Sequence, residues 1–406
     1  MSSASIAPEN PPTLAASDAP VQVAQWSGVW AMTLCVFALI ASEFMPVSLL
    51  TPMAADLGVS EGWAGYGIAI SGALAVVTSL SISTLAGGMN RKTLLLWLTA
   101  LMAVSGAVVA LASNYLAYML GRAMIGVVIG GFWSMSAATA MRLVPAAQVP
   151  RALAIFNGGN ALATVIAAPL GSYLGSVIGW RGAFLCLIPV AAIAWVWQWR
   201  SLPAMVSQPT AGSRQVFGLL TQRLVALGMA GCGAFFMGQF VLFTYVRPFL
   251  ETVTGAGVPA VSLVLLGIGV AGFIGTVVIG ACLRRSLYRT LVTLPLLMAV
   301  IALALIPASA WLWPVATLLT VWGLLATAAP VGWWTWIAEA LPAQAEAGGG
   351  LMVAVIQLAI ALGSTVGGVL FDHWGYRSTF VASAMVLALA AFLALLASRA
   401  RLARLH

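Results

Sequence analysis

The chain is poor in charge. Of its 406 residues only 6% are charged, whereas 62% are hydrophobic and the mean hydropathy is +1.06. A water-soluble domain carries about 25% charged residues, because its surface has to be hydrated. The shortage of charge therefore excludes a soluble globular protein and indicates a chain whose surface faces lipid.

Residue types that support catalysis, metal binding and nucleotide binding are also scarce. Lys92 is the only lysine and no G-x-x-x-x-G-K-[ST] motif occurs, so ATP is not indicated as an energy source. The two histidines are His373, in a predicted loop, and His406, at the end of the chain. The four cysteines fall within apolar runs and lack the spacing of metal ligands or of a disulfide framework. We expect no enzymatic activity, no metal and no cofactor.

Long apolar runs fill most of the chain. About twenty apolar residues in a helix cross roughly 30 Å of hydrocarbon, and a helix satisfies its own backbone groups there. The predicted spans are residues 27–50, 62–86, 93–112, 115–141, 152–175, 183–201, 223–246, 260–283, 290–308, 311–337, 348–370 and 378–397. The sequence thus predicts an all-α membrane protein with twelve transmembrane helices.

The basic residues indicate the orientation of these helices. An even number of spans puts both ends of the chain on one side of the membrane. With residue 1 inside, thirteen of the 17 basic residues fall in inner segments and three, Arg181, Arg247 and Arg377, in outer loops. Basic residues accumulate on the cytoplasmic side, so we expect both termini in the cytoplasm. The basic balance then reflects orientation and contact with anionic lipid, and gives no indication of nucleic acid.

The two halves of the chain are weakly repeated. A shift of 196 residues aligns EFMPVSLLTP (43–52) with QFVLFTYVRP (239–248), and GWRGAF (179–184) with GYRSTF (375–380). Transporters are often built from such repeats. We expect two pseudo-symmetric six-helix bundles with a cleft between them. The predicted parts are a disordered cytoplasmic leader (1–26), an N-terminal bundle (27–201), a cytoplasmic linker (202–222), a C-terminal bundle (223–397) and a cytoplasmic tail (398–406).

Several stretches resemble the major facilitator superfamily, specifically its proton-driven efflux branch. They are GRAMIGVVIGG (121–131), AAPLGSYLG (167–175) and GWRGAF (179–184). Within that branch, PVGWWTWI (330–337) and VAVIQLA (353–359) resemble bacterial purine ribonucleoside efflux pumps.

The resemblance implies a function. It implies an antiporter, acting as a monomer in the bacterial inner membrane, that exports purine nucleosides such as inosine and guanosine against protons by alternating access. Because the EFMPVSLLTP stretch is shared with sugar efflux relatives, export of sugars or drugs is the alternative. The resemblance also makes Pro169 and Gly171, in the antiporter-type stretch, candidates for conformational change.

Glu43 is the one acidic residue that lies well inside a predicted span. Burial in a medium of low dielectric disfavours the charged form of a carboxyl group, which makes an intramembrane acid a functional candidate. We expect Glu43 to take up a proton from outside and release it inside, influenced by Arg122, which lies at a similar depth. The alternative is a static ion pair between Glu43 and Arg122 that holds two helices together.

Pro46 supports a position of Glu43 beside a cavity. The proline ring removes the amide that would bond the carbonyl of Ser42, which leaves a bent helix and a free acceptor next to the acid. Such breaks are tolerated in membranes where they face protein or water. We place the outer end of this first helix near Pro52.

Other spans contain candidates for substrate contact. Gln239 is the repeat equivalent of Glu43, and its neutral amide suits a hydrogen bond to a base or sugar. Asn157 and Asn160 share one helix face, and Gln357 is a further amide. For the asparagines and Gln357, interhelical hydrogen bonding without a substrate is the alternative.

Two aromatic residues next to Gln239 are further candidates. The rings of Phe240 and Phe243 suit stacking on a heterocycle, whereas packing against helices or lipid is the alternative.

An intramembrane enzyme would need a second acid or a metal cluster in the spans, and a channel would need a filter sequence. A secondary transporter is the class that the sequence favours.

Overall fold

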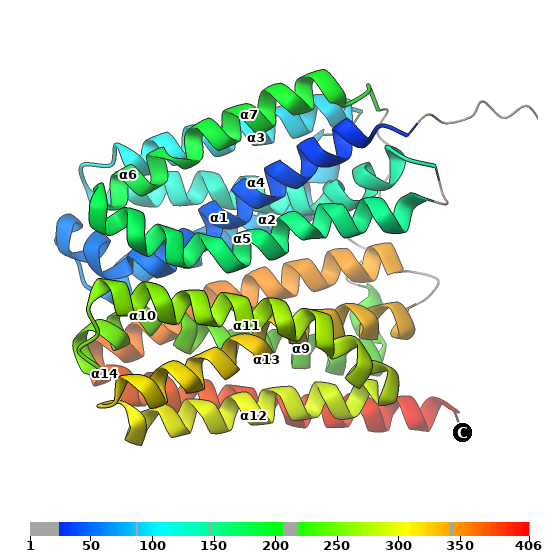
Figure 1. The fold of residues 1–406 in the computed structure, drawn as a ribbon. Coiled ribbons are helices and arrows are strands. Elements are labelled where there is room, and N and C mark those ends of the chain that lie inside the picture. Colours follow the sequence, from blue (N-terminus) through cyan, green and yellow to red (C-terminus); the bar gives the residue numbers. More distant parts are fainter. Residues whose placement is uncertain (1–23, 87, 146–147, 206–217, 342–344, 406) are drawn as a thin grey trace, which may run out of the picture.

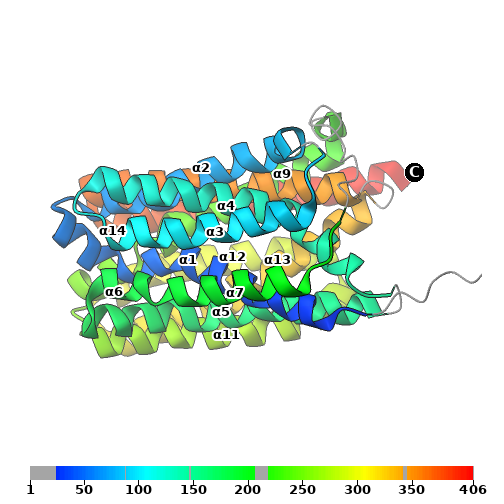
Figure 2. The same ribbon diagram turned by 90° about the horizontal axis from the view of Figure 1, so that it is seen from above.

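Helices make up the fold, and the described part of the chain contains no strand. The computed structural model describes residues 24–405, except residue 87 and the ranges 146–147, 206–217 and 342–344. The expected leader (1–26) and the centre of the expected linker (202–222) therefore lie largely outside the described residues. The apolar runs fold as long helices that lie side by side along one common direction (Figures 1 and 2).

Six membrane crossings form the first bundle. Its helices are α1 (Trp26–Leu57), α2 (Glu61–Ala86), α3 (Arg91–Ala110), α4 (Tyr115–Arg142), α5 (Val149–Val177) and the pair α6 (Gly179–Leu185) and α7 (Leu187–Ser201), which share the sixth crossing. Asparagine side chains cap the N-termini of two of these helices. The side chain of Asn90 accepts from the amide of Lys92, and that of Asn114 accepts from the amide of Ala117.

The second bundle repeats this order. After the short 3₁₀ turn η2 (Leu219–Thr221), it contains α9 (Arg223–Phe243), α10 (Val246–Pro248) and the π-helical turn η3 (Phe249–Val253), followed by α11 (Val258–Arg285), α12 (Leu287–Ala308), α13 (Leu312–Ala340) and α14 (Ala345–Leu405). Helix α14 is interrupted at Gly375, which has φ +75°. It therefore makes two crossings.

The count of membrane crossings agrees with the sequence. Eleven helices among the described residues are long and apolar enough to span a membrane, and the last covers the 55 residues of Gly348–Leu402. At about 1.5 Å per residue this segment is far longer than one bilayer requires. Its break at Gly375 gives the twelfth crossing.

Left-handed glycines mark the pseudo-repeat in the backbone. Gly179 and Gly375 both have φ +75°, and they are separated by the 196 residues of the sequence repeat. A side chain would be strained in this conformation, so glycine is required at both corners. Each corner lies between the fifth and sixth crossings of its own bundle, which is where a repeat predicts a shared turn.

The two bundles are stacked as two layers, with α1 to α7 above and α9 to α14 below in Figure 1. The layers meet along two helix pairs, α2 with α14 and α5 with α11. Glycines permit the close approach. A Cβ atom at Gly72 would lie 2.8 Å from the carbonyl oxygen of Gln357, and one at Gly269 would lie 2.7 Å from the Cα of Val165. The start of α1 and the end of α14 lie at the same end of the molecule.

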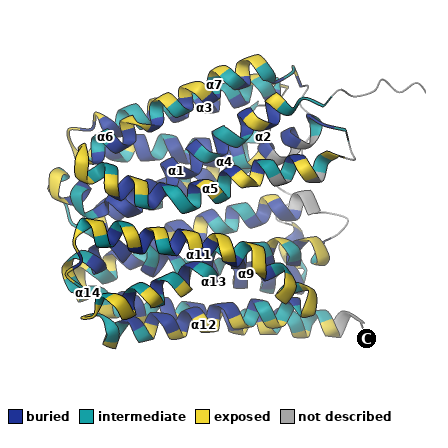
Figure 3. Cartoon of the chain, viewed as in Figure 1, coloured by how far each residue is buried: buried dark blue, intermediate teal, exposed yellow. Residues whose placement is uncertain are grey.

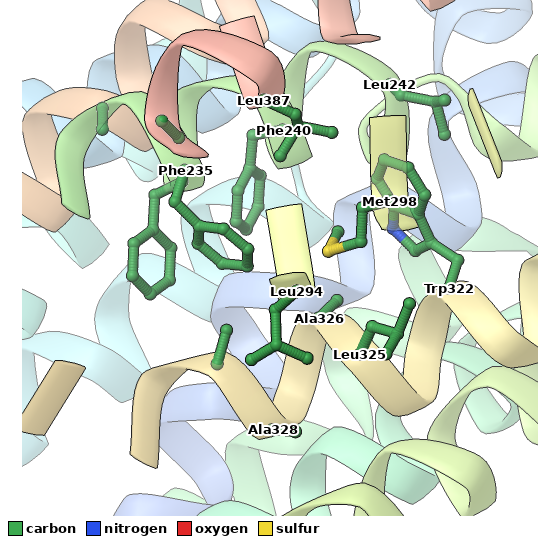
Figure 4. Close-up of a cluster of buried hydrophobic side chains, with 14 of the residues drawn as sticks. Phe235, Phe240, Leu242, Leu294, Met298, Trp322, Leu325, Ala326, Ala328 and Leu387 are labelled. Carbon is green, nitrogen blue, oxygen red and sulfur yellow. The ribbon is translucent and has the colours of Figure 1, made fainter. Parts of the chain in front are cut away.

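Apolar side chains fill the interior of each bundle and also cover its outside. In the second bundle the buried cluster includes Phe235, Met298 and Trp322 (Figure 4). Residues on the outward faces of the helices are exposed (Figure 3), and many are large and apolar, such as Val277 and Val300. An apolar exterior of this extent fits contact with lipid.

The first helix extends farther than the sequence indicates. Helix α1 continues through both Pro46 and Pro52 and ends at Leu57, where Gly58 adopts a left-handed conformation. The prediction that it ends near Pro52 is therefore wrong. A proline removes one amide donor but leaves the other turns intact, and in a packed bundle neighbouring helices can satisfy the carbonyl that it frees.

Candidate functional site

Glu43 lies on α1 where the two bundles face each other. Its side chain is buried, with an exposed fraction of 6%, and it is the only acidic residue in the buried class among the side chains whose burial the structure describes. Its Oε1 accepts a hydrogen bond of 3.3 Å from Nε2 of Gln357, on α14 of the second bundle. Gln357 is equally buried. The carboxyl group thus connects the bundles through a single amide.

Arg122 lies close to Glu43 but contacts its main chain. The guanidinium donates from Nη1 to the carbonyl of Ser42 at 2.8 Å and from Nη2 to the carbonyl of Glu43 at 3.4 Å. It also donates from Nη2 to Oγ of Ser71 at 3.1 Å and from Nε to the carbonyl of Gly67 at 3.1 Å. Arg122 is 1% exposed, so α4 holds α1 and α2 through one buried side chain.

The static ion pair considered between Glu43 and Arg122 is not formed. The structure shows ion pairs such as Arg181 with Asp56, Arg247 with Glu251 and Arg401 with Glu339, and these do not include Glu43 or Arg122. The physical reason lies in Pro46. It leaves the Ser42 carbonyl without its helical donor, as predicted, and this buried acceptor takes the guanidinium. The similar depth of the two residues was therefore a sound inference, whereas carboxylate pairing was not.

Aromatic rings continue the contact between the bundles next to Glu43. Phe44 of α1 lies against Phe240 of α9, with 6.1 Å between the ring centroids. Phe240 in turn meets Phe243 edge to face, also at 6.1 Å. Phe240 is buried (Figure 4), and Phe243 is half-buried. Phe240, one of the two sequence candidates for stacking, therefore packs on the residue that follows Glu43 in the chain, and Phe243, the other, packs on Phe240.

Two amide oxygens near this contact have no hydrogen-bond donor in the protein. They belong to Gln239, which is half-buried on α9 and adjoins Phe240, and to Gln357. Buried acceptors are usually paired, because desolvation without a partner costs about 1–3 kcal/mol. Both residues were selected from the sequence, and both present an unsatisfied acceptor.

The asparagines on α5 lie in a different setting. Asn157 is exposed and donates from Nδ2 to the carbonyl of Leu153 in its own helix at 2.9 Å. Asn160 is half-buried, and its main-chain carbonyl accepts from the hydroxyl of Thr164 at 2.9 Å. The structure does not show either side chain in contact with Glu43.

The proline and glycine on α5 pack near α1. Pro169 lies inside α5 and is half-buried. Gly171 is buried, and a Cβ atom there would lie 2.6 Å from Oγ of Ser48. The glycine thus permits the close approach of α1 and α5.

Sequence reasoning missed the burial of Arg247. Arg247 was placed in an outer loop, but it lies in α10 with an exposed fraction of 4% and pairs with Glu251 at 2.8 Å. Its guanidinium also bonds the carbonyl of Ser48. Pro52, four residues after Ser48, was the available signal, because it frees that carbonyl just as Pro46 frees the carbonyl of Ser42.

The two helical bundles have equivalent glycine turns, and a hydrogen bond between a buried carboxyl group and a buried amide joins them. This arrangement is that of a membrane transporter of the two-bundle type. Comparison with known families gives the same class. The family described as Major Facilitator Superfamily matches residues 32–349. The chain belongs to this superfamily of transporters.

Curated relatives cover nearly the whole chain. It is 64% identical over 394 residues to the protein named transcription regulatory protein OpdE of Pseudomonas aeruginosa, covering 95% of this chain and 97% of that protein. It is 41% identical over 366 residues to the purine ribonucleoside efflux pump NepI of Salmonella typhimurium, covering 90% of this chain and 92% of the pump.

Solved structures share the fold at low sequence identity. A D-xylose–proton symporter has a TM-score of 0.71 at 17% identity, covering 91% of this chain and 96% of its own. The nucleoside transporter NupG, in a mutant form, has a TM-score of 0.71 at 12% identity, covering 91% and 98%. An inward-facing bacterial homologue of the lysosomal transporter Spinster has a TM-score of 0.69 at 17% identity, covering 93% and 97%.

Proposed function

We propose that this transporter is a proton-coupled antiporter that exports purine ribonucleosides, such as inosine and guanosine, across the bacterial inner membrane. The cargo is supported by the 41% identity to a purine ribonucleoside efflux pump. Proton coupling is supported by Glu43. The transporter then works as a monomer with both termini in the cytoplasm, uses the proton gradient as its energy source, and needs no cofactor and no nucleic acid.

The hydrogen bond between Glu43 and Gln357 carries this proposal. An ionised carboxylate only accepts hydrogen bonds, whereas a protonated carboxyl group also donates one. The unpaired Oε1 of Gln357 belongs to the amide that already contacts Glu43, so it is the natural acceptor for that donor. Gain or loss of the proton therefore changes a bond that runs between the bundles. This is the property that a coupling residue needs, because the bundles must move relative to each other.

The proposed cargo site consists of polar and aromatic groups near the contact between the two bundles. The amide oxygens of Gln239 and Gln357 lack donors, and the N–H groups of a purine and the hydroxyls of a ribose supply them. Phe240 and Phe243 offer ring faces and edges to a heterocycle. Asn157 and Asn160 of α5 are additional polar contacts in this proposal.

The remaining residues act through the backbone. Arg122 holds the Ser42 and Glu43 carbonyls and thereby positions the carboxyl group. Pro46 and Pro169 are points at which α1 and α5 adjust when the bundles rock, and Gly171 is where these two helices slide past each other. With one buried acid, we expect one proton to be exchanged per nucleoside.

Transport into inverted membrane vesicles tests the proposal. The lumen of such vesicles corresponds to the outside of the cell, so an acidic lumen drives accumulation of labelled inosine or guanosine by the wild-type protein. Glu43→Gln keeps the shape of the side chain but cannot carry a proton. It should exchange nucleoside across the membrane yet fail to accumulate it.

A matched acid provides the control. Glu61→Gln changes a half-buried carboxyl at the start of α2, away from Gln357, and should accumulate nucleoside as the wild type does. Uphill transport by Glu43→Gln equal to that of the wild type would show that Glu43 is not the proton carrier. Accumulation of arabinose or of drugs in place of nucleosides would keep the coupling mechanism and select the alternative cargo.

A further inference from the structure

Hydrogen bonds join the two bundles at the end of the molecule opposite the start of α1, which is the left end in Figure 1. Arg247 of the second bundle donates to the carbonyl of Ser48 and, at 3.3 Å, to the hydroxyl of Ser172. The hydroxyl of Ser262 donates to the same Ser172 Oγ at 2.9 Å. We call the end of the molecule where Arg247, Glu251, Ser48, Ser172 and Ser262 lie the gated end.

Asp372 reinforces the contact at this end. Its carboxylate accepts from the amide of Gly62 at 3.0 Å and from the hydroxyl of Ser60. These groups begin α2 in the first bundle, where backbone amides have no partner within the helix and the helix dipole favours a negative charge. The space is tight, since a Cβ atom at Gly62 would lie 2.2 Å from Oδ2 of Asp372. The bundles are therefore closed on each other here.

The bond from Arg247 depends on an irregularity of α1. Pro52 has no amide hydrogen, so the carbonyl of Ser48, four residues earlier, lacks its helical donor. The guanidinium supplies that donor from the opposite bundle. A charged donor on a buried carbonyl makes a strong hydrogen bond, and the interaction needs no second charge on α1. The bond can therefore be made and broken without leaving an unpaired charge in the first bundle.

The charge of Arg247 also has a partner that moves with it. Glu251 lies one helical turn away in the same bundle, and its Oε1 is 2.8 Å from Nη2. The neighbouring atoms, Nε of Arg247 and Oε2 of Glu251, are both buried without a partner. Because Nε and Nη2 lie on one edge of the guanidinium, a small rotation gives the side-on arrangement with two parallel hydrogen bonds.

We propose that Arg247 is the gate residue at this end of the transporter. In the closed state it donates to Ser48 and Ser172 of the first bundle. When the site opens at this end, it releases both and pairs side-on with Glu251, so that the charge stays neutralised within the second bundle. This inference concerns the conformational change and depends neither on the proposed cargo nor on proton coupling.

A distance measurement between the bundles tests this exchange. Spin labels are placed at Ser113→Cys, in the turn before α4, and Ala310→Cys, in the turn before α13, both exposed and both at the gated end. The exposed native cysteines Cys186 and Cys282 are replaced by serine, while the buried ones are kept. Double electron–electron resonance is then recorded on the full chain in lipid nanodiscs, without nucleoside or pH gradient.

The variants give opposite expectations. Arg247→Ala should raise the ratio of long to short distances about tenfold, which corresponds to about 1.4 kcal/mol. Ser172→Ala, a milder change that keeps the ion pair, should shift the ratio in the same direction by less. Glu251→Gln should leave the ratio at or below that of the wild type, because it removes the partner that Arg247 uses in the open state.

Ser176→Ala is the matched control for Ser172→Ala. Ser176 lies four residues after Ser172 on α5, but its hydroxyl donates to the carbonyl of Tyr173 in the same helix. Its removal should leave the distances unchanged. Wild-type distances in Arg247→Ala and Ser172→Ala, or equal opening in Arg247→Ala and Glu251→Gln, would overturn the proposal, because the pair would then only support the local fold of α10.

Discussion

Nη1 of Arg122 lies 2.8 Å from the carbonyl oxygen of Ser42, the backbone group that Pro46 deprives of its helical hydrogen bond. A buried cation thus completes the backbone of a neighbouring helix. The interaction fixes the turn of α1 from which Glu43 projects. It uses main-chain carbonyls, so the carboxyl group of Glu43 remains free to accept from Gln357.

Arg122→Ala is expected to destabilise the protein. It leaves the buried carbonyl of Ser42 without a donor, at about 1–3 kcal/mol, and removes a second donor from the carbonyl of Gly67. The melting temperature in detergent should fall by several degrees, and Arg122→Lys should restore only part of it, because one ammonium cannot reach all four acceptors. The pH profile of transport should also change, since Glu43 loses its fixed position. A lower melting temperature with an unchanged pH profile would make Arg122 a structural residue only.

Gln357→Leu is expected to weaken coupling more than folding. The substitution keeps a side chain of similar size but removes the donor to Glu43 and an acceptor for cargo. Accumulation of nucleoside against its gradient should fall about tenfold or more, and exchange without a gradient should fall less. Gln239→Leu, which lacks the contact with Glu43, should raise the KM for nucleoside and leave coupling intact. Identical behaviour of the two variants would mean that Gln357 serves the cargo alone.

Glycines at the bundle interface and within a bundle should respond differently to alanine. At Gly130, inside the first bundle, a Cβ atom would lie 2.2 Å from the carbonyl oxygen of Ala75, so Gly130→Ala should cost about 1–3 kcal/mol and lower the melting temperature. At Gly72 the clash is with the second bundle. Gly72→Ala should leave the melting temperature nearly unchanged and reduce the transport rate, because it disfavours the closed pairing of α2 and α14.

Cysteine labelling on intact cells should establish the orientation. In a chain that keeps only its buried cysteines, Ala310→Cys at the gated end should react with a membrane-impermeant maleimide added outside. Ser201→Cys, at the last residue of α7 and at the end of the molecule opposite the gated end, should react only after the cells are permeabilised. The reverse pattern would contradict the excess of basic residues expected on the cytoplasmic side.

Some properties were predictable because they depend on the order of residues along the chain. Apolar length fixes the number of crossings, and the 196-residue repeat fixes the two bundles. The depth of Glu43 and Arg122 follows from the helical rise. The free carbonyl at Ser42 follows from Pro46 alone, because the covalent structure of proline has no amide hydrogen to donate.

The partners of these groups could not be derived in the same way. The contacts between side chains of different helices depend on the rotation of each helix about its axis and on how the bundles pack against each other. Neither can be derived from the spacing of residues within one segment. Tertiary packing therefore decided that Arg122 bonds the Ser42 carbonyl instead of a carboxylate, that Glu43 meets Gln357, and that Arg247 is buried against Ser48. The sequence determined where unsatisfied groups occur in the membrane, and the packing of the two bundles determined what satisfies them.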